Sequence, residues 1–288
     1  MKLVRTTAVA VALLSASSAA AQWRSDQAST RAAGMGNAGL WLRDDAALFY
    51  NPAQLAVARG TSVSGEYRSA DDHDGALSSA TSFGKGGVAV GMTARQQTTT
   101  PLVDVGGALV NGPPESVTSL LAAAGIGQTF KGQRLGVVGK YDSRQFGNSR
   151  YSQTLLDIGV AHDFGRYITA GVVARDVRVR GGYNYNWNPY RTVAGVAASG
   201  PVGPLDVVTA LNVSSGPDVG WETNFGAEAA YSWLSGYSIA ARAGTSSPDG
   251  PRHFTLGVGL TRDRVSIDYA FDNTHVGPNG HRVGLRIQ

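Results

Sequence analysis

The amino-acid sequence predicts an all-β fold: a transmembrane antiparallel up-and-down β-barrel of about 14 strands, with a short N-terminal helical hatch in the lumen. Three observations predict it. Apolar residues alternate with small or polar ones over most of the chain, the alternating segments are even in number, and short connections between them take turns with longer ones. The composition agrees, because 38 glycines and only 16% charged residues suit strands that have one face in lipid.

The chain begins with the pattern of a secretory signal peptide. Lys2 and Arg5 precede an apolar run that is too short to span a bilayer, and the small residues at positions 19–21 form a cleavage site. We therefore expect residues 1–21 to be a signal peptide and the mature chain to reach the bacterial outer membrane. No later segment has the roughly 18–20 consecutive apolar residues of a transmembrane helix. The lack of cysteine excludes a disulfide scaffold and thiol chemistry.

The strand positions follow from the alternation itself. Along "HFTLGVGLT", Phe254, Leu256 and Val258 fall on one face, while Thr255 and Gly257 fall on the other. Large apolar residues that face lipid and small or polar residues that face a lumen are typical of a membrane barrel. The strands are expected to begin near Thr61, Ala76, Gly86, Val117, Arg134, Tyr151, Ile168, Tyr190, Leu205, Trp221, Gly236, Arg252, Val265 and His281.

The connections between these strands are alternately short and long. Short turns fall at residues 84–85, 131–133, 165–166, 200–203, 234–235 and 262–264, and the longest of the intervening loops covers residues 97–116. An outer-membrane barrel has short turns on its periplasmic rim and longer loops outside. Phe83, Phe130, Phe164 and Trp233 each precede a short turn, which predicts an aromatic girdle at that rim.

Residues 22–59 do not alternate, whereas residues 60–288 hold the expected strands. The earlier segment is rich in glycine and alanine and contains two helix starts. Asp44 or Asp45 can cap a short helix through Leu48, and Asn51 can cap a second one with Pro52 at its first position. A compact segment before a barrel is expected to fill the lumen as a hatch or plug. Its motif residues are Gly34, Gly36, Asp44, Asp45, Asn51, Pro52 and Ala53.

Both ends of the sequence resemble a known group of barrels. The lead contains "GMGNA", the Asp44-Asp45 pair and "NPAQL", and the end contains "YAF", Thr274-His275 and "HRVGLRI". These patterns are similar to those of the PorV/PorQ family within the FadL-like outer-membrane β-barrel superfamily. The resemblance implies a barrel of about 14 strands with a hatch in its lumen.

Two functions follow from this resemblance. The first is a non-enzymatic secretion or surface-assembly accessory of PorV/PorQ type, which binds exported proteins at its outer loops. The alternative is a FadL-like channel that takes up hydrophobic small molecules through a lateral opening, and a kinked strand beside the hatch would favour it. Outer-membrane lipid and the barrel-assembly machinery are expected partners in both cases. An exported protein is a further partner of the first, and a hydrophobic ligand of the second.

Charged residues on the lumen side of the strands are mixed in sign. Because a ring of one sign would indicate ion selectivity, we expect instead a salt-bridged network that fixes the hatch and closes the pore. The Asp44-Asp45 pair is expected to dock onto arginines such as Arg175 or Arg242. The network comprises Glu66, Arg68, Arg95, Lys140, Asp142, Asp157, Arg175, Glu228, Arg242, Asp268 and Arg286.

Nothing in the sequence indicates catalysis. The five histidines are scattered, and there is no HExxH, GxSxG or glycine-rich phosphate loop. We therefore expect no enzyme activity, no catalytic residue, no metal and no cofactor. The formal net charge is only +4, with two of the positive charges in the signal peptide, so nucleic acid is not an expected partner.

Overall fold

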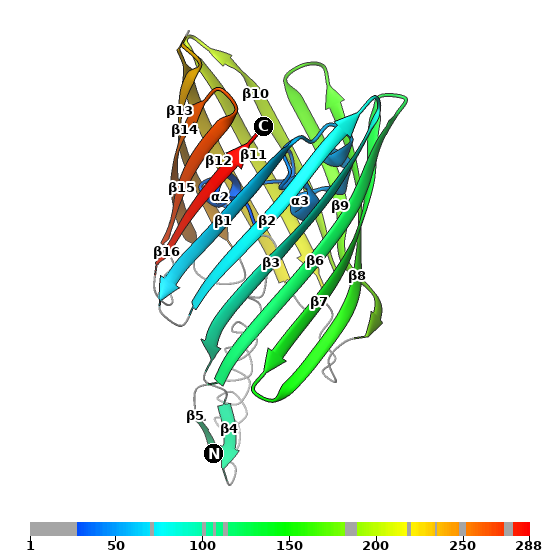
Figure 1. The fold of residues 1–288 in the computed structure, drawn as a ribbon, viewed down its shortest axis with the longest axis vertical. Helices are drawn as coiled ribbons and strands as arrows, with labels where there is room; N and C mark the ends of the chain where they lie inside the picture. Colours follow the sequence, from blue (N-terminus) through cyan, green and yellow to red (C-terminus); the bar gives the residue numbers. More distant parts are fainter. Residues whose placement is uncertain are drawn as a thin grey trace, which may run out of the picture.

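The computed structural model describes residues 28–69, 72–99, 102–105, 108–111, 115–181, 189–217, 220–233, 235–247, 252–273 and 279–288. Within these residues, fourteen strands form one closed antiparallel barrel that holds the hatch segment inside it (Figure 1). The predicted fold class is confirmed. The expected signal peptide, Thr274 and His275 lie outside the described residues.

The strands follow one another around the barrel in chain order, except that β3 pairs with β6. The barrel closes where β1 pairs with β16. Most strands start close to the predicted positions, and the largest difference is β2, which begins before the expected Ala76. The barrel strands are β1 (Gly60–Ser69), β2 (Asp72–Phe83), β3 (Gly86–Thr99), β6 (Glu115–Phe130), β7 (Gln133–Phe146), β8 (Ser149–Phe164), β9 (Ile168–Gly181), β10 (Arg191–Val202), β11 (Leu205–Gly216), β12 (Gly220–Ser232), β13 (Tyr237–Ser247), β14 (His253–Arg262), β15 (Val265–Asn273) and β16 (Gly280–Ile287).

The longest predicted loop contains further strand structure. β3 and β6 both extend into it, and between them β4 (Leu102–Val105) pairs with β5 (Ala108–Asn111) in a separate two-stranded sheet beyond the end of the barrel (Figure 1). The prediction of a plain loop over residues 97–116 is therefore wrong. Pairing satisfies the backbone groups of this segment, a requirement that alternation alone does not reveal.

The short turns gather at one end of the barrel, which we call the short-turn rim and which is uppermost in Figure 1. Lys131 and Gly132, between β6 and β7, both have positive φ angles of 49° and 81°. Two positive φ angles in a two-residue loop make a type I′ hairpin turn, whose twist matches that of the strands. The hatch lies in the half of the barrel nearer to this rim (Figure 1).

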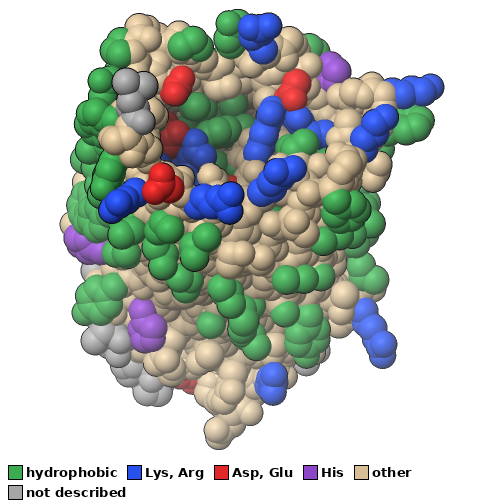
Figure 2. Space-filling view, turned by 45° about the horizontal axis from the view of Figure 1, so that its top comes forward, with side chains coloured by type: hydrophobic (Ala, Val, Ile, Leu, Met, Phe, Trp, Pro, Cys, Tyr) green, Lys and Arg blue, Asp and Glu red, His purple; other side chains and the backbone are tan. Residues whose placement is uncertain are grey.

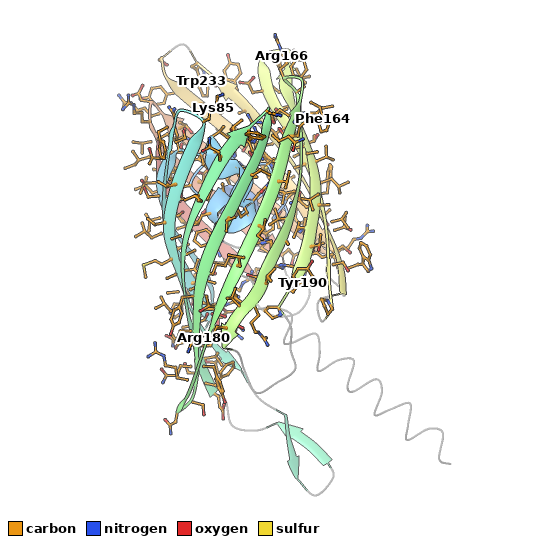
Figure 3. All side chains as sticks on the ribbon, turned by 90° about the vertical axis from the view of Figure 1, so that its right-hand side faces the viewer. Lys85, Phe164, Arg166, Arg180, Tyr190 and Trp233 are labelled. Atoms are coloured by element: carbon orange, nitrogen blue, oxygen red, sulfur yellow. The ribbon has the colours of Figure 1, made fainter. Side chains whose placement is uncertain are left out.

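The outer surface of the barrel is apolar and its interior is charged. On β14, Phe254 and Leu256 are 45% and 44% exposed, whereas Thr255 between them is buried. Phe164 and Trp233 lie at the short-turn rim, and Tyr190 lies toward the opposite end (Figure 3). An apolar outer band with aromatic residues at its edges and a polar interior is the arrangement of a bacterial outer-membrane barrel, and this protein is one.

Leu256→Arg is expected to destabilise the barrel by about 2–4 kcal/mol, because it places a charge near the middle of the lipid face. Leu260→Arg is the control on the same face of β14, close to the short turn that follows Arg262, and is expected to cost only about 0–1 kcal/mol. Urea unfolding in lipid vesicles measures both. Equal losses for the two variants would contradict the position of the apolar band.

From residue 28 onward, the hatch contains three short helical turns. α2 (Thr30–Ala33) has Ser29 as its N-cap, and η2 (Pro52–Ala56) is a 3-10 helix whose N-cap Asn51 accepts the backbone N–H of Ala53 at 3.0 Å. The predicted cap at Asn51 is confirmed. None of the helices in the described part of the chain has the length and apolar character needed to cross a membrane.

The predicted helix cap at the acidic pair is wrong. α3 (Ala47–Tyr50) begins after Ala46, which has no side chain to cap it. Asp44 accepts the backbone N–H of Ala46 at 3.2 Å, and Ala46 precedes the helix, whereas a cap accepts from its second or third residue. Both carboxylates of the pair instead face the barrel wall, and the helix starts beyond them.

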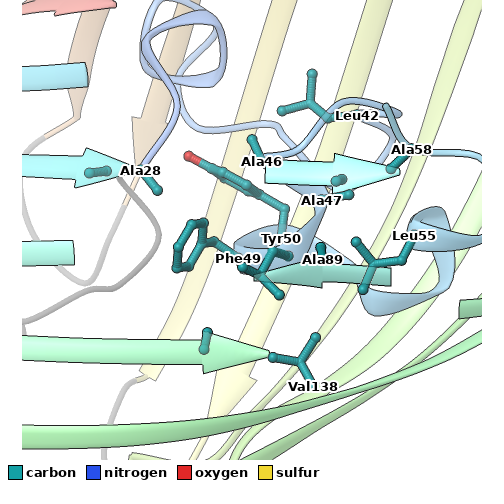
Figure 4. Packing of buried hydrophobic residues seen from close by; sticks show 14 of the residues in the cluster. Ala28, Leu42, Ala46, Ala47, Phe49, Tyr50, Leu55, Ala58, Ala89 and Val138 are labelled. Carbon is teal, nitrogen blue, oxygen red and sulfur yellow. The ribbon is translucent and has the colours of Figure 1, made fainter. Parts of the chain in front are cut away.

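The largest apolar core lies between the hatch and the wall rather than within the wall. Leu48, Phe49 and Leu55 are fully buried, and they pack with small or branched residues such as Ala89 of β3 and Val138 of β7 (Figure 4). Burial of these side chains is the main force that holds the hatch in the lumen.

Candidate functional site: the hatch and the lumen wall

The hatch backbone lies so close to the wall that side chains are excluded at several points. A Cβ atom at Gly136 on β7 would overlap the carbonyl oxygen of Pro52, and one at Gly244 on β13 would overlap the backbone nitrogen of Gly36. Glycine is required for such an approach. We call the positions where this holds the wall glycines. They are Gly87, Gly127, Gly136, Gly226 and Gly244.

The predicted motif glycines of the hatch, Gly34 and Gly36, lie against β14 and β13 of the barrel wall. Gly36 donates its backbone N–H to Oγ1 of Thr255 at 2.9 Å. Gly34 lies against Gly257, where a Cβ atom on Gly34 would come within 3.1 Å of the Gly257 Cα atom. The two glycines thus let the segment after α2 follow the wall.

Asn51 joins two parts of the hatch. Besides capping η2, its side-chain amide donates to the carbonyl oxygen of Leu40 at 3.1 Å. Pro52 and Ala53 follow it in the fully buried first turn of η2, which faces β7 and β8. The Asn-Pro-Ala sequence therefore fixes both the direction of the chain and its distance from the wall.

The acidic pair docks where the barrel closes. Asp44 Oδ2 lies 2.5 Å from Nη1 of Arg286 on β16. Asp45 Oδ2 accepts hydrogen bonds from the hydroxyls of Ser62 on β1 and Ser78 on β2, the latter at 2.5 Å. The hatch is thereby fastened to the three strands that bring the first and last parts of the barrel together.

The predicted partners of the acidic pair, Arg175 and Arg242, are engaged elsewhere. Arg175 donates to the carbonyl oxygen of Phe49, and Arg242 pairs with Glu228 at 2.5 Å and with Asp268 at 2.6 Å. The prediction of a lumen arginine as partner is confirmed for Asp44, which binds Arg286, but the two arginines named for it are wrong. Opposite charge indicates arginine as a partner, but the path of the hatch decides which arginine it meets.

Burial raises the pKa of Asp45 to about 6, and the Asp44 carboxylate beside it acts in the same direction. The hydrogen bonds from Ser62 and Ser78 and the charge of Arg286 oppose the rise. The Asp45 carboxyl has a higher pKa in the docked hatch than in the released one. At pH values between these two pKa values, the docked form binds more protons. Docking of the hatch is therefore strongest below the pKa of the released form and weakens as the pH rises through 6.

We expect the hatch to be held about 1.4 kcal/mol more tightly at pH 5 than at pH 7.5, which is the part of the Asp45 linkage that lies above pH 5. Hydrogen exchange of the hatch amides at the two pH values, corrected for the intrinsic exchange rate, measures it. Asp45→Asn removes the titrating group and is expected to abolish the dependence. A dependence that persists in Asp45→Asn would contradict this assignment.

The structure brings most of the predicted network residues together in three buried clusters. In the β9 cluster, Nζ of Lys140 lies 2.5 Å from Oδ2 of Asp157 and 2.8 Å from Oδ1 of Asp176. Arg191 lies 3.6 Å from Asp176, and Arg175 lies 4.0 Å from Asp157. This cluster therefore joins β7, β8, β9 and β10.

The other two clusters lie across the lumen. In the Arg242 cluster, Arg31 of α2 pairs with Glu228 at 2.5 Å, so that the hatch shares this carboxylate with Arg242. In the Arg282 cluster, Arg282 pairs with Glu66 and Asp74, both at 2.7 Å. Three of the remaining predicted residues form further ion pairs: Arg68 with Glu66 and Asp272, Arg95 with Asp72, and Asp142 with Arg144.

Sequence reasoning missed Arg31, Asp176, Arg191 and Arg282. Arg282 alternates with Val283, so its lumen position follows from the pattern. Asp176 does not, because β9 is irregular at that residue. The pairing of β8 with β9 shifts twice, between Thr154 and Leu155 and between Leu156 and Ile158.

The ladder between β9 and β10 ends at the same place. Asp176 has a φ angle of 56°, and its backbone N–H bonds to the Asp157 side chain at 2.8 Å. The last pair between β9 and β10 is Arg175 with Arg191, so residues 176–181 of β9 pair only with β8 among the described residues. The bulge and the end of this ladder therefore lie directly beside the hatch carbonyl that Arg175 holds.

A cavity of about 330 Å³ opens at the short-turn rim. It lies between the hatch and strands β8 to β10, and Figure 2 shows the mouth of the barrel as a hollow surrounded by Lys and Arg side chains. Trp41 and Arg43 border it on the hatch side, and Asp163, Thr169 and Ser199 border it on the wall. We call it the rim cavity.

Comparison with solved structures places the fold. The toluene transporter TbuX of Ralstonia pickettii matches with a TM-score of 0.59 and 11% identity, over 89% of this chain and 97% of that one. A FadL homologue of Pseudomonas aeruginosa matches with a TM-score of 0.57 and 10% identity, over 90% and 97%.

The protein has the FadL-like barrel fold. The monoaromatic hydrocarbon channel CymD agrees, with a TM-score of 0.60 and 11% identity over 89% of this chain and 95% of that one. No family model matches the sequence, and comparison with curated proteins by sequence finds no match. At these identities the likeness concerns the fold alone.

Proposed function

We propose that this protein is a FadL-like channel that admits small hydrophobic molecules through a lateral opening at β9. The observation that carries the proposal is the end of the β9–β10 ladder at Arg175, where β9 bulges beside the hatch. A barrel wall whose ladder is interrupted can open to lipid, where hydrophobic molecules concentrate. The kink that the sequence resemblance associates with a channel thus has a counterpart here.

The charges at the opening suit a gate. Lys140 and Arg191 both form ion pairs with Asp176, so the carboxylate of this residue links the bulge of β9 to β7 and β10. Ionic groups in the lumen make the direct way down the barrel axis unfavourable for an apolar molecule, because they would lose their hydration and partners. A lateral route avoids them.

The main expectation from the sequence, an accessory of PorV/PorQ type, has less support. It rests on the resemblance of the two chain ends, and the structural neighbours named above are transporters and channels. An accessory of that kind would bind exported proteins at its outer loops. Purification from the outer membrane separates the two proposals, since a co-purified exported protein supports the accessory and co-purified apolar molecules support the channel.

The bulge itself provides a sharper test. Asp176→Val removes the charge and disfavours a positive φ angle, so it straightens β9, whereas Asp176→Asn also removes the charge but tolerates this conformation. Cells that carry the Val variant in the outer membrane are expected to take up radiolabelled toluene severalfold more slowly than cells with the Asn variant. Heat modifiability shows that both barrels are assembled. Equal uptake by the two would refute the lateral opening.

A further inference from the structure

The rim cavity continues into the wall of the barrel. Along the lumen face of β9 and β10, three pairs of residues stand directly opposite one another: Thr169 with Ala197, Gly171 with Gly195, and Val173 with Val193. All six are small or branched and uncharged. They form a shallow channel, which we call the β9–β10 furrow, from the rim cavity to the Arg175–Arg191 pair that ends the β9–β10 ladder.

Two hatch side chains fill this furrow. Leu40 packs on Val173 and Val193, and its Cδ2 atom would lie 3.0 Å from a Cβ atom at Gly195. Trp41 follows and borders both the rim cavity and a filled cleft that reaches Gly171 and Gly195. Together the two side chains separate the Arg175–Arg191 end of the furrow from the rim cavity.

The contact at the furrow differs from the contacts at the wall glycines. At the wall glycines, the hatch presents its backbone, which cannot withdraw without moving the whole segment. At Gly171 and Gly195, the nearest hatch atoms belong to the side chains of Asn51 and Leu40. A side chain changes rotamer without displacing the backbone, so Leu40 can clear the furrow while the hatch backbone stays in place.

Trp41 is held by weak, reversible contacts. The guanidinium of Arg31 lies 4.8 Å from the centre of its ring, and the indole N–H, although buried, makes no hydrogen bond in the described part of the chain. Arg31 is itself anchored on Glu228 of β12. An indole without a hydrogen bond loses only packing and this cation–π contact when it turns away.

We propose that the β9–β10 furrow is the path by which a solute passes the hatch, and that Leu40 and Trp41 are the side chains that close it. This inference rests on the proposed function and extends it from the lateral opening to the short-turn rim. The solutes are small and uncharged, because the furrow has no charged side chain and a bare ion would lose its hydration there. Benzoate is therefore excluded where toluene passes.

Cysteine labelling tests the path, since the chain has no cysteine of its own. Ser199→Cys places a thiol in the rim cavity on β10, and Ser82→Cys places one at the same rim on β2, away from the furrow. After treatment with a small methanethiosulfonate reagent, toluene uptake by cells is expected to fall severalfold for Ser199→Cys and to stay unchanged for Ser82→Cys. Mass spectrometry verifies that both thiols are modified. Unchanged uptake by labelled Ser199→Cys would overturn the furrow.

Trp41→Ala tests the gate independently of toluene. Liposomes that contain the purified protein are expected to admit arabinose, a small uncharged solute, severalfold faster in a swelling assay with Trp41→Ala than with Trp41→Phe, which retains an aromatic ring. Equal swelling rates of these variants would overturn the role of Trp41. If the parent takes up no toluene but Trp41→Ala still speeds swelling, the proposed function fails while the path past the hatch stands.

Discussion

Gly136→Ala is expected to release the hatch from β7 while leaving the barrel closed. The added methyl group would overlap the carbonyl oxygen of Pro52, which belongs to the backbone and has no rotamer to change. Overpacking of this kind costs about 1–3 kcal/mol, and the hatch bears the cost because the strand is held by its ladder on both sides. Hydrogen exchange is expected to rise across η2, and conductance in planar bilayers to increase.

Gly139→Ala is the matched control on the same strand. Nothing lies within 4 Å of a Cβ atom at Gly139, so the variant is expected to behave as the parent in both measurements. Heat modifiability of all three proteins shows that the barrel is assembled. If η2 stays as protected in Gly136→Ala as in the parent, then the hatch does not press on the wall as the structure indicates.

Lys140→Met is expected to cost about 3–5 kcal/mol of barrel stability. The ammonium is fully buried and is shared by Asp157 and Asp176, so its removal leaves two buried carboxylates with longer contacts to arginine. Methionine retains most of the volume of lysine, and the loss therefore reports the charge. Urea unfolding in lipid vesicles measures it.

Arg262→Met is the control for an ion pair at the surface. Arg262 lies 3.9 Å from Asp263, and both side chains are more than half exposed, so the expected loss is about 0–1 kcal/mol. Should Lys140→Met fail to fold, Lys140→Met with Asp157→Asn removes one orphaned charge and is expected to fold. Equal losses for Lys140→Met and Arg262→Met would mean that the β9 cluster contributes no more than a surface pair.

The barrel could be predicted from the sequence alone, because the pleat of a strand is local. Successive side chains point to opposite faces, so the alternation around Leu256 records which side meets lipid, and the short turns record where the chain reverses. Asn51 and Pro52 likewise predict a helix start, since a cap depends on residues within one turn. These features need no knowledge of distant parts of the chain.

What lies against each lumen residue depends on the tertiary fold. Alternation places Thr255 and Gly136 toward the interior, but it does not indicate that one binds the Gly36 N–H and the other contacts Pro52. Opposite charge likewise predicts an arginine partner for Asp44 but not Arg286 in particular, because charge does not fix the path of the hatch. The bulge at Asp176 interrupts the period of two, so alternation predicts neither the end of the β9–β10 ladder nor the ion cluster beside it. Contacts between residues far apart in sequence are set by closure of the barrel around the hatch, which no local pattern encodes.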